Sequence, residues 1–254
     1  MDFTFGGVFS RFFKLIGENL SSLLVVGLLF TIAPAVASYY GLFIWASTNG
    51  TDWQTTFMTM RPEVYALLGG GGLVFIILNL IGTCAITEIA ILGGGGSKVN
   101  LASVLSHAVR NAFPVLILGF IVGLLTALLS LLLIIPGIMF LLAAYVAIPA
   151  YVGQPGLGLW GAVKRSFELT RNHRWGILGL LIVMGIISGI ISAALSGIAS
   201  VTPMADVPLS LSITQGLING ASTLIDQIFV AAIYVSLRKS KDRTMPEQAA
   251  AVFE

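Results

Sequence analysis

Apolar residues run along this chain in six stretches, and each is a candidate helix that crosses a lipid bilayer. A membrane-spanning helix needs about 20 mostly apolar residues. The fourth stretch is the shortest and contains Pro149. The tripeptide Ile135-Pro136-Gly137 separates it from the third stretch, because proline interrupts helical hydrogen bonding. The pattern predicts an all-α integral membrane protein with about six transmembrane helices in one bundle. The predicted spans are 21–46, 65–92, 113–134, 138–153, 175–199 and 213–237.

A second apolar pattern precedes each odd-numbered span. Apolar residues recur at helical spacing over 5–16, 101–112 and 159–167, with basic residues on the opposite side. Amphipathic helices of this kind are suited to the headgroup layer of a membrane. We therefore expect three amphipathic surface helices in a single polytopic membrane domain, 1–240, followed by a short tail, 241–254. The domain contains a possible threefold repeat of one surface helix plus two spans, over 1–97, 98–156 and 157–240.

The lysine and arginine residues predict an orientation, because loops on the cytoplasmic side of a membrane carry an excess of them. Twelve of the 13 such residues lie before the first span, after the last, or in the connections that follow the even-numbered spans, and Arg61 lies on the other side. The sequence therefore predicts a multi-pass protein whose two termini and three surface helices are cytoplasmic. The segments 47–64 and 200–212 and the Pro136 turn then face outward.

The composition supports the membrane class and excludes others. Hydrophobic residues make up 57% of the chain and charged residues 9%, whereas a soluble domain has about 25% charged residues. A soluble enzyme, a disordered chain and a nucleic-acid binder are therefore excluded. Cys84 is the only cysteine, and His107 and His173 are the only histidines. Their spacing matches neither a metal site nor an acyl-transfer triad, so we expect no cofactor and no enzymatic activity.

Four polar residues form a candidate intramembrane site. Asp226 lies near the middle of the sixth span, and Glu88 lies near the cytoplasmic end of the second, with Asn79 and Asn219 also at membrane depth. A charged residue in the bilayer costs about 2.5–3.5 kcal/mol on insertion scales. The functional interpretation is a proton or cation site, or a polar path through the bundle. The alternative is interhelical hydrogen bonding that fixes packing.

Glycines form a second pattern at membrane depth. Small residues recur every four positions in the fifth span, and Gly216 and Gly220 form a similar pair in the sixth. Small-residue stripes let helices approach closely, either within one chain or between copies. The run 69–72 is expected to be flexible or unwound, because glycine disfavours helix. The candidate packing residues of the fifth span are Gly185, Gly189, Ala193 and Gly197.

Basic and aromatic residues gather around the third surface helix. Basic residues flanked by interfacial aromatics suit anionic lipid headgroups, although ordinary orientation anchors have the same composition. The expected partners are anionic lipids of the cytoplasmic leaflet, with a homo-oligomer or a partner membrane protein as a further possibility. The candidate headgroup contacts are Trp160, Lys164, Arg165, Arg171, Arg174 and Trp175.

Two segments of the chain resemble a known family. Residues 155–181 read PGLGLWGAVKRSFELTRNHRWGILGLL, similar to A-x-x-x-S-x-x-L-T-r-x-x-x-W, and residues 231–238 read AAIYVSLR, similar to a closing Y-x-x-L-R. They resemble the membrane domain of some bacterial glycerophosphoryl diester phosphodiesterases and its stand-alone relatives. The resemblance implies a protein of the bacterial inner membrane. It implies no catalytic residue here, because the fused enzymes keep their chemistry in a separate barrel domain.

Three functions are compatible with these patterns. The leading hypothesis is a non-catalytic inner-membrane protein that organises lipids or partner proteins through its basic surface helices. The alternative is a transporter or channel for a small or lipid-like substrate, with Asp226 and possibly Glu88 in its path. An intramembrane enzyme acting on lipid is the third, and no motif supports it.

Overall fold

The computed structural model describes residues 4–48, 62–93, 100–154, 156–201 and 207–252, and within them the chain is helical without a β-strand. The first helix continues through a short π-helix, η1, into the second. The sixth and seventh helices together make up the predicted fourth span. The elements are α1 (Phe5–Gly27), η1 (Leu28–Ile32), α2 (Ala33–Thr48), α4 (Pro62–Gly93), α5 (Leu101–Leu132), α6 (Ile134–Ala144), α7 (Ala147–Gly153), α8 (Gly158–Thr170), α9 (Arg174–Val201) and α10 (Val207–Val252).

Five helical segments in the described residues are long and apolar enough to cross a membrane. A sixth is added if α8 and α9, which meet at a bend of 92°, are counted as one broken span. An all-helical fold with five or six potential spans is therefore confirmed. The five segments are Phe5–Gly41, Gly72–Leu92, Leu101–Leu132, Ile134–Gly153 and Ile213–Asp242.

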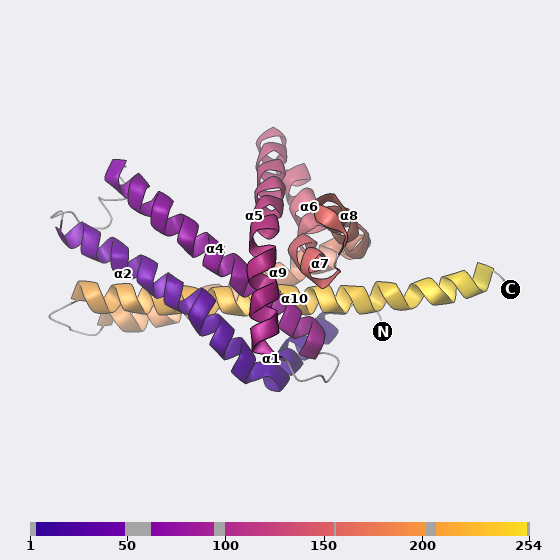
Figure 1. Ribbon diagram of the computed structural model, residues 1–254, viewed down its shortest axis with the longest axis horizontal. Coiled ribbons are helices and arrows are strands. Elements are labelled where there is room, and N and C mark those ends of the chain that lie inside the picture. Colours follow the sequence, from indigo (N-terminus) through magenta and orange to yellow (C-terminus); the bar gives the residue numbers. More distant parts are fainter. Residues whose placement is uncertain (1–3, 49–61, 94–99, 155, 202–206, 253–254) are drawn as a thin grey trace.

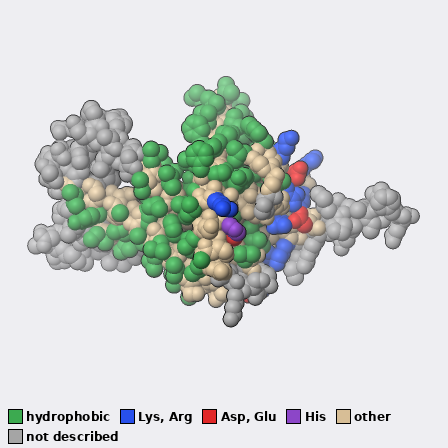
Figure 2. Space-filling model, in the orientation of Figure 1, with side chains coloured by type: hydrophobic (Ala, Val, Ile, Leu, Met, Phe, Trp, Pro, Cys, Tyr) green, Lys and Arg blue, Asp and Glu red, His purple; other side chains and the backbone are tan. Residues whose placement is uncertain are grey.

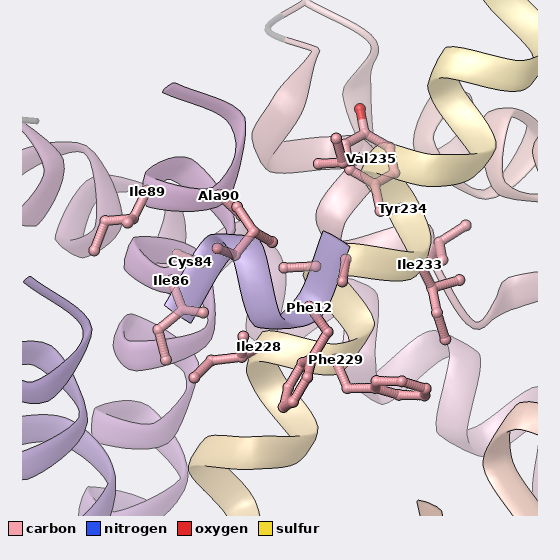
Figure 3. Packing of buried hydrophobic residues seen from close by; sticks show 14 of the residues in the cluster. Phe12, Cys84, Ile86, Ile89, Ala90, Ile228, Phe229, Ile233, Tyr234 and Val235 are labelled. Atoms are coloured by element: carbon pink, nitrogen blue, oxygen red, sulfur yellow. The ribbon is translucent and has the colours of Figure 1, made fainter. Parts of the chain in front are cut away.

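The helices form a bundle with one hairpin standing away from it (Figure 1). The helix α10 lies along the long axis of the molecule, and α2, η1, α1 and α4 pack against it. The core between α1, α4 and α10 is apolar and includes the rings of Phe12 and Phe229, whose centroids lie 5.8 Å apart (Figure 3). The helices α5 and α6 pair with each other and cross the bundle steeply.

The three predicted surface helices join their spans in different ways. The helix α1 bends at Asn19 (φ −126°, ψ 22°), between the predicted surface helix and the first span. The second segment is continuous with the third span in α5, which passes through Pro114. The third is the separate helix α8, and the turn after it holds Asn172 at a φ of 71°.

The apolar faces of the first two segments point into the bundle. Val8 and Phe12 are buried in α1, and Val104 and Ala108 are buried in α5. These side chains belong to the same core cluster as α4 and α10. The sequence predicts that these faces lie in the headgroup layer. In the structure, part of each face packs against protein instead.

The buried face of α8 differs from the predicted apolar stripe. Trp160 of that stripe is 63% exposed, whereas Ala162, Ser166 and Leu169 are fully buried. The Ser166 and Thr170 hydroxyls donate to the carbonyl oxygen of Ala143, at 2.7 and 3.2 Å. The last carbonyls of a helix have no partner within it, and α6 ends at Ala144. The face with Ser166 and Thr170 is turned inward, where the hydroxyls bond to the backbone at the break in the fourth span.

The predicted helix breaks are found close to their expected positions. Leu133 is extended (φ −154°, ψ 131°) between α5 and α6. Pro136 and Pro149 each lie in the first turn of the next helix, where a missing N–H costs nothing. The glycine run 69–72, in contrast, is helical within α4, so the prediction of unwinding is wrong. In lipid, no water is available to bond the backbone, so these glycines stay in a helix, in which the backbone satisfies its own hydrogen bonds.

The tip of the α5–α6 hairpin is entirely apolar. Leu131, Leu132, Leu133, Ile134 and Ile135 are between 67% and 85% exposed. Space-filling atoms show this hairpin as a hydrophobic projection from the bundle (Figure 2). Such a surface suits hydrocarbon and not water.

Candidate functional site

Charged side chains gather where α8 meets the second half of α10, and we call this region the charged end (Figure 2). Arg165 of α8 contacts Asp242 of α10 at 2.5 Å, between Nη2 and Oδ1. The other carboxylate oxygen of Asp242 lies 3.2 Å from Nε of Arg238, and Arg165 also reaches Glu168 at 3.5 Å. One carboxylate therefore bridges two guanidinium groups and ties the third surface helix to the last span.

A cavity of about 280 Å³ lies beside this ion-pair network. Tyr234 is fully buried, and its hydroxyl makes no hydrogen bond in the described structure. In Figure 3 this hydroxyl points away from the other labelled side chains of the core. Nη1 of Arg238 donates to the carbonyl oxygen of Gly153, at 3.4 Å. The cavity is lined by Ile91, Tyr234, Val235, Arg238, Lys239 and Asp242.

The predicted headgroup contacts divide into two groups. Trp160, Trp175, Lys164 and Arg171 are exposed around the bend between α8 and α9. Arg165 and Arg174 are engaged with protein instead: Arg165 is in the ion pairs described above, and the Arg174 guanidinium lies 5.6 Å from the centre of the Phe167 ring. Within the described residues, the first group makes no ion pair, and it is the part of the cluster that faces outward from the protein.

Glu88 is paired across two helices. One of its oxygens lies 2.9 Å from Nδ1 of His107, which belongs to the second predicted surface segment. The carboxyl of α4 therefore has a partner on α5 near the predicted cytoplasmic end of both. This geometry favours a structural tie between α4 and α5 over an isolated charge.

A polar network crosses the bundle at membrane depth. The Thr31 hydroxyl donates to Oε1 of Gln227 at 3.1 Å, and Nε2 of Gln227 lies 3.3 Å from both Oδ1 and the carbonyl oxygen of Asn79. The network joins η1, α4 and α10. Thr31 was not among the residues predicted for the polar site, because a single threonine in an apolar run is too common to signal one.

Asp226 lies apart from this network. Its side chain is exposed, and in the described part of the chain it makes no hydrogen bond or ion pair. It is twelve residues from Arg238, or about 18 Å along a helix. Asn219 is exposed on the same face of α10, and its amide donates to the Gln215 carbonyl within the helix. Within the described part of the chain, Asp226 is thus neither sealed among helices nor paired.

The two glycine patterns have different surroundings. A Cβ on Gly216 would lie 2.5 Å from Cα of Val36, and one on Gly220 would lie 2.7 Å from Cα of Ile32. These glycines let α10 approach α2 and η1 closely. A Cβ on Gly185 or Gly189 would meet nothing within 4 Å. Ala193 of the same stripe is exposed, and the surroundings of Gly197 fall outside the described side chains.

The described residues hold no group of three His, Cys, Asp or Glu that could bind a metal ion. The Ser166 hydroxyl donates to the Ala143 carbonyl oxygen. Cys84 is buried in the core.

Comparison with known proteins leaves the family open. No family model matches the chain, and neither the curated proteins nor the solved structures contain a match. Of the two segments that carry the resemblance, 155–181 includes the buried face of α8, and 231–238 includes Tyr234 and Arg238, which line the cavity.

The sequence pointed to Arg165 of the charged end but not to the residues that α10 contributes to it. Tyr234, Arg238 and Asp242 were not singled out as a site. The available signal was the spacing of Arg238 and Asp242, because residues four apart on a helix are neighbours. Their contact with Arg165 joins positions 77 residues apart, and no local pattern predicts such a contact.

Proposed function

We propose that this protein is a non-catalytic protein of the bacterial inner membrane that binds anionic lipids at its charged end. Through them it would organise lipid or partner membrane proteins, with the charged end and both termini in the cytoplasm. The observation that carries the proposal is the exposed set Trp160, Lys164, Arg171 and Trp175 around the bend between α8 and α9.

The geometry of the bend supports this proposal. A helix bent by 92° from its span lies close to the membrane plane when that span is upright. Tryptophan is enriched at the membrane–water interface, and Trp160 and Trp175 lie on either side of the bend and are 63% and 74% exposed. Each basic residue near an anionic surface contributes about 1 kcal/mol, so Lys164 and Arg171 together favour anionic lipid measurably.

The test is lipid selection in proteoliposomes. Brominated phosphatidylglycerol should quench the protein's tryptophan fluorescence more than brominated phosphatidylcholine does. Raising the salt from about 0.1 M to about 1 M should reduce the difference, because the Debye length falls from about 10 Å to about 3 Å. The double variant Lys164→Gln, Arg171→Gln should lose most of the preference.

A variant of opposite sign is the matched control. Glu168 lies on the same helix and its side chain is 65% exposed. Glu168→Gln removes a negative charge and should increase the preference for the anionic lipid. Equal quenching by the two lipids in the unmodified protein would reject the proposal.

A second candidate function has one specific observation in its favour. Asp226 is exposed near mid-span without a partner in the described structure, on the face that carries Asn219. A carboxyl that only fixed packing would have a hydrogen-bond partner. Movement of a proton or small cation along α10 would explain why the Asp226 carboxyl has no partner in the described structure.

The variant Asp226→Asn separates the two functions. Under the lipid proposal it keeps the phosphatidylglycerol preference, and its thermal midpoint in detergent is unchanged or higher, because a costly carboxyl is replaced by a neutral group. Liposomes loaded with a pH-sensitive dye measure proton entry with the unmodified protein and with the variant. Entry that requires Asp226 would make transport the leading function.

A further inference from the structure

We propose that the cavity between α4 and α10 binds the phosphate group of a glycerophospholipid. This inference deepens the proposed function and rests on it, since it assigns one specific headgroup position at the charged end. The two are separable, because the exposed residues of the α8–α9 bend do not line the cavity.

Two buried polar atoms at this place lack a partner. The Tyr234 hydroxyl belongs to a side chain with no exposed area; the Arg238 side chain lies beside its oxygen, and its own O–H has no acceptor in the described structure. Nε of Arg165, whose Nη2 contacts Asp242, is also buried without a partner, although Arg165 does not itself line the cavity. Buried polar atoms in native proteins nearly always have partners. Both groups can donate, so the missing partner is an acceptor such as a phosphate oxygen.

The charges around the cavity favour the same kind of ligand. Arg238 and Lys239 line it, and Asp242 is already held by two guanidinium groups at 2.5 and 3.2 Å. Arginine recognises carboxylate and phosphate oxygens through the same paired N–H groups. Asp242 therefore occupies an oxyanion position, and a phosphate in the cavity competes with it for Arg238.

The size and the apolar lining favour a lipid. About 280 Å³ is at or just below the lower end of the range for small-molecule sites, which suits a phosphate with its glycerol. Ile91 and Val235 supply apolar contacts for the carbons that follow. A Cβ on Gly153 would lie 2.7 Å from the Tyr234 hydroxyl and 2.7 Å from Cδ1 of Ile91, so glycine keeps this space open.

The experiment is isothermal titration calorimetry of the protein in detergent. The probes are short-chain phosphatidylglycerol, short-chain phosphatidylethanolamine, glycerol 3-phosphate and inorganic phosphate. We expect both short-chain lipids to bind more tightly than inorganic phosphate. Equal binding of glycerol 3-phosphate and the lipids would assign the same phosphate site to a soluble ester. No binding of any of the four would overturn the proposal.

Three variants test the geometry: two should weaken lipid binding and one should strengthen it. Arg238→Gln should weaken lipid binding about tenfold, the effect of losing one charge-assisted hydrogen bond. Tyr234→Phe should weaken binding several-fold without lowering the thermal midpoint of the ligand-free protein, because the lost hydroxyl has no partner. Asp242→Asn should strengthen binding, because it removes the competing carboxylate. Arg110→Gln, an exposed arginine of α5, is the matched control and should bind like the unmodified protein.

The outcomes keep the two proposals apart. Unchanged affinity in both Arg238→Gln and Tyr234→Phe, or weaker binding in Asp242→Asn, would overturn the cavity assignment. If Lys164→Gln, Arg171→Gln still abolishes the vesicle preference in that case, the proposed function stands without it. If the vesicles show no preference while the cavity variants change lipid binding as expected, the proposed function fails and the cavity binds the phosphate of a glycerophospholipid without selecting an anionic headgroup.

Discussion

At the scale of single residues, Ser166 and Thr170 show how a polar side chain serves a break in a membrane helix. Both lie on the buried face of α8. The Ser166 hydroxyl donates to the Ala143 carbonyl, where α6 ends, and the Thr170 hydroxyl is shared between that carbonyl at 3.2 Å and the Ser166 carbonyl at 2.9 Å. A carbonyl at membrane depth without a donor is costly. These two hydroxyls therefore explain why the third surface helix packs against the fourth span at a fixed position.

Removing these hydroxyls should lower stability in steps. Each net hydrogen bond contributes about 1 kcal/mol, so Ser166→Ala and Thr170→Val should each lower the thermal midpoint in detergent by a few degrees, and the double variant by more. Thr126→Val is the control, because its hydroxyl bonds only to Val122 within α5. A double variant as stable as this control would contradict the explanation.

Two adjacent phenylalanines show that the sequence does not predict which apolar side chains face the protein. Phe12 is 7% exposed and Phe13 is 65% exposed, although the two side chains are identical. A bilayer accepts apolar groups as readily as a protein core does. Hydropathy therefore predicts which residues enter the membrane but not which of them face the protein.

At the scale of elements, the close contact of α10 with α2 and η1 depends on Gly216 and Gly220. The backbone of η1 at Ile32 lies too near for any side chain on Gly220. The stripe on α9 has the same spacing and open surroundings at Gly185 and Gly189. Identical sequence patterns thus serve different purposes, and only the partner helix distinguishes them.

This contrast predicts opposite effects of the same substitution. Gly220→Ala should lower the thermal midpoint in detergent, because its Cβ would lie 2.7 Å from a backbone atom. Gly189→Ala should leave the midpoint unchanged or raise it, because alanine favours helix by about 1 kcal/mol over glycine and nothing lies within 4 Å. A clear loss of stability in Gly189→Ala would show that something outside the described contacts covers this face.

At the scale of the whole molecule, the sequence predicted the class and most of the spans. Long apolar runs and proline breaks are local signals, so the five apolar segments and the break near Pro136 were within reach. The steep crossing of the α5–α6 hairpin was not, because no local pattern encodes the angle between helices. The Arg165–Asp242 contact could not be predicted either, because it depends on how α8 packs against α10, and the two residues are 77 positions apart in the chain.

The apolar tip of the α5–α6 hairpin has a consequence for the synthesis of the protein. No Lys, Arg, Asp or Glu occurs between Arg110 and Lys164, and the tip residues expose only hydrocarbon. The two arms can therefore leave the translocation machinery together, as one unit, without carrying any charged group across the bilayer. We therefore expect Arg110 and Lys164, the nearest charged residues on either side of this stretch, to stay together on one side of the membrane.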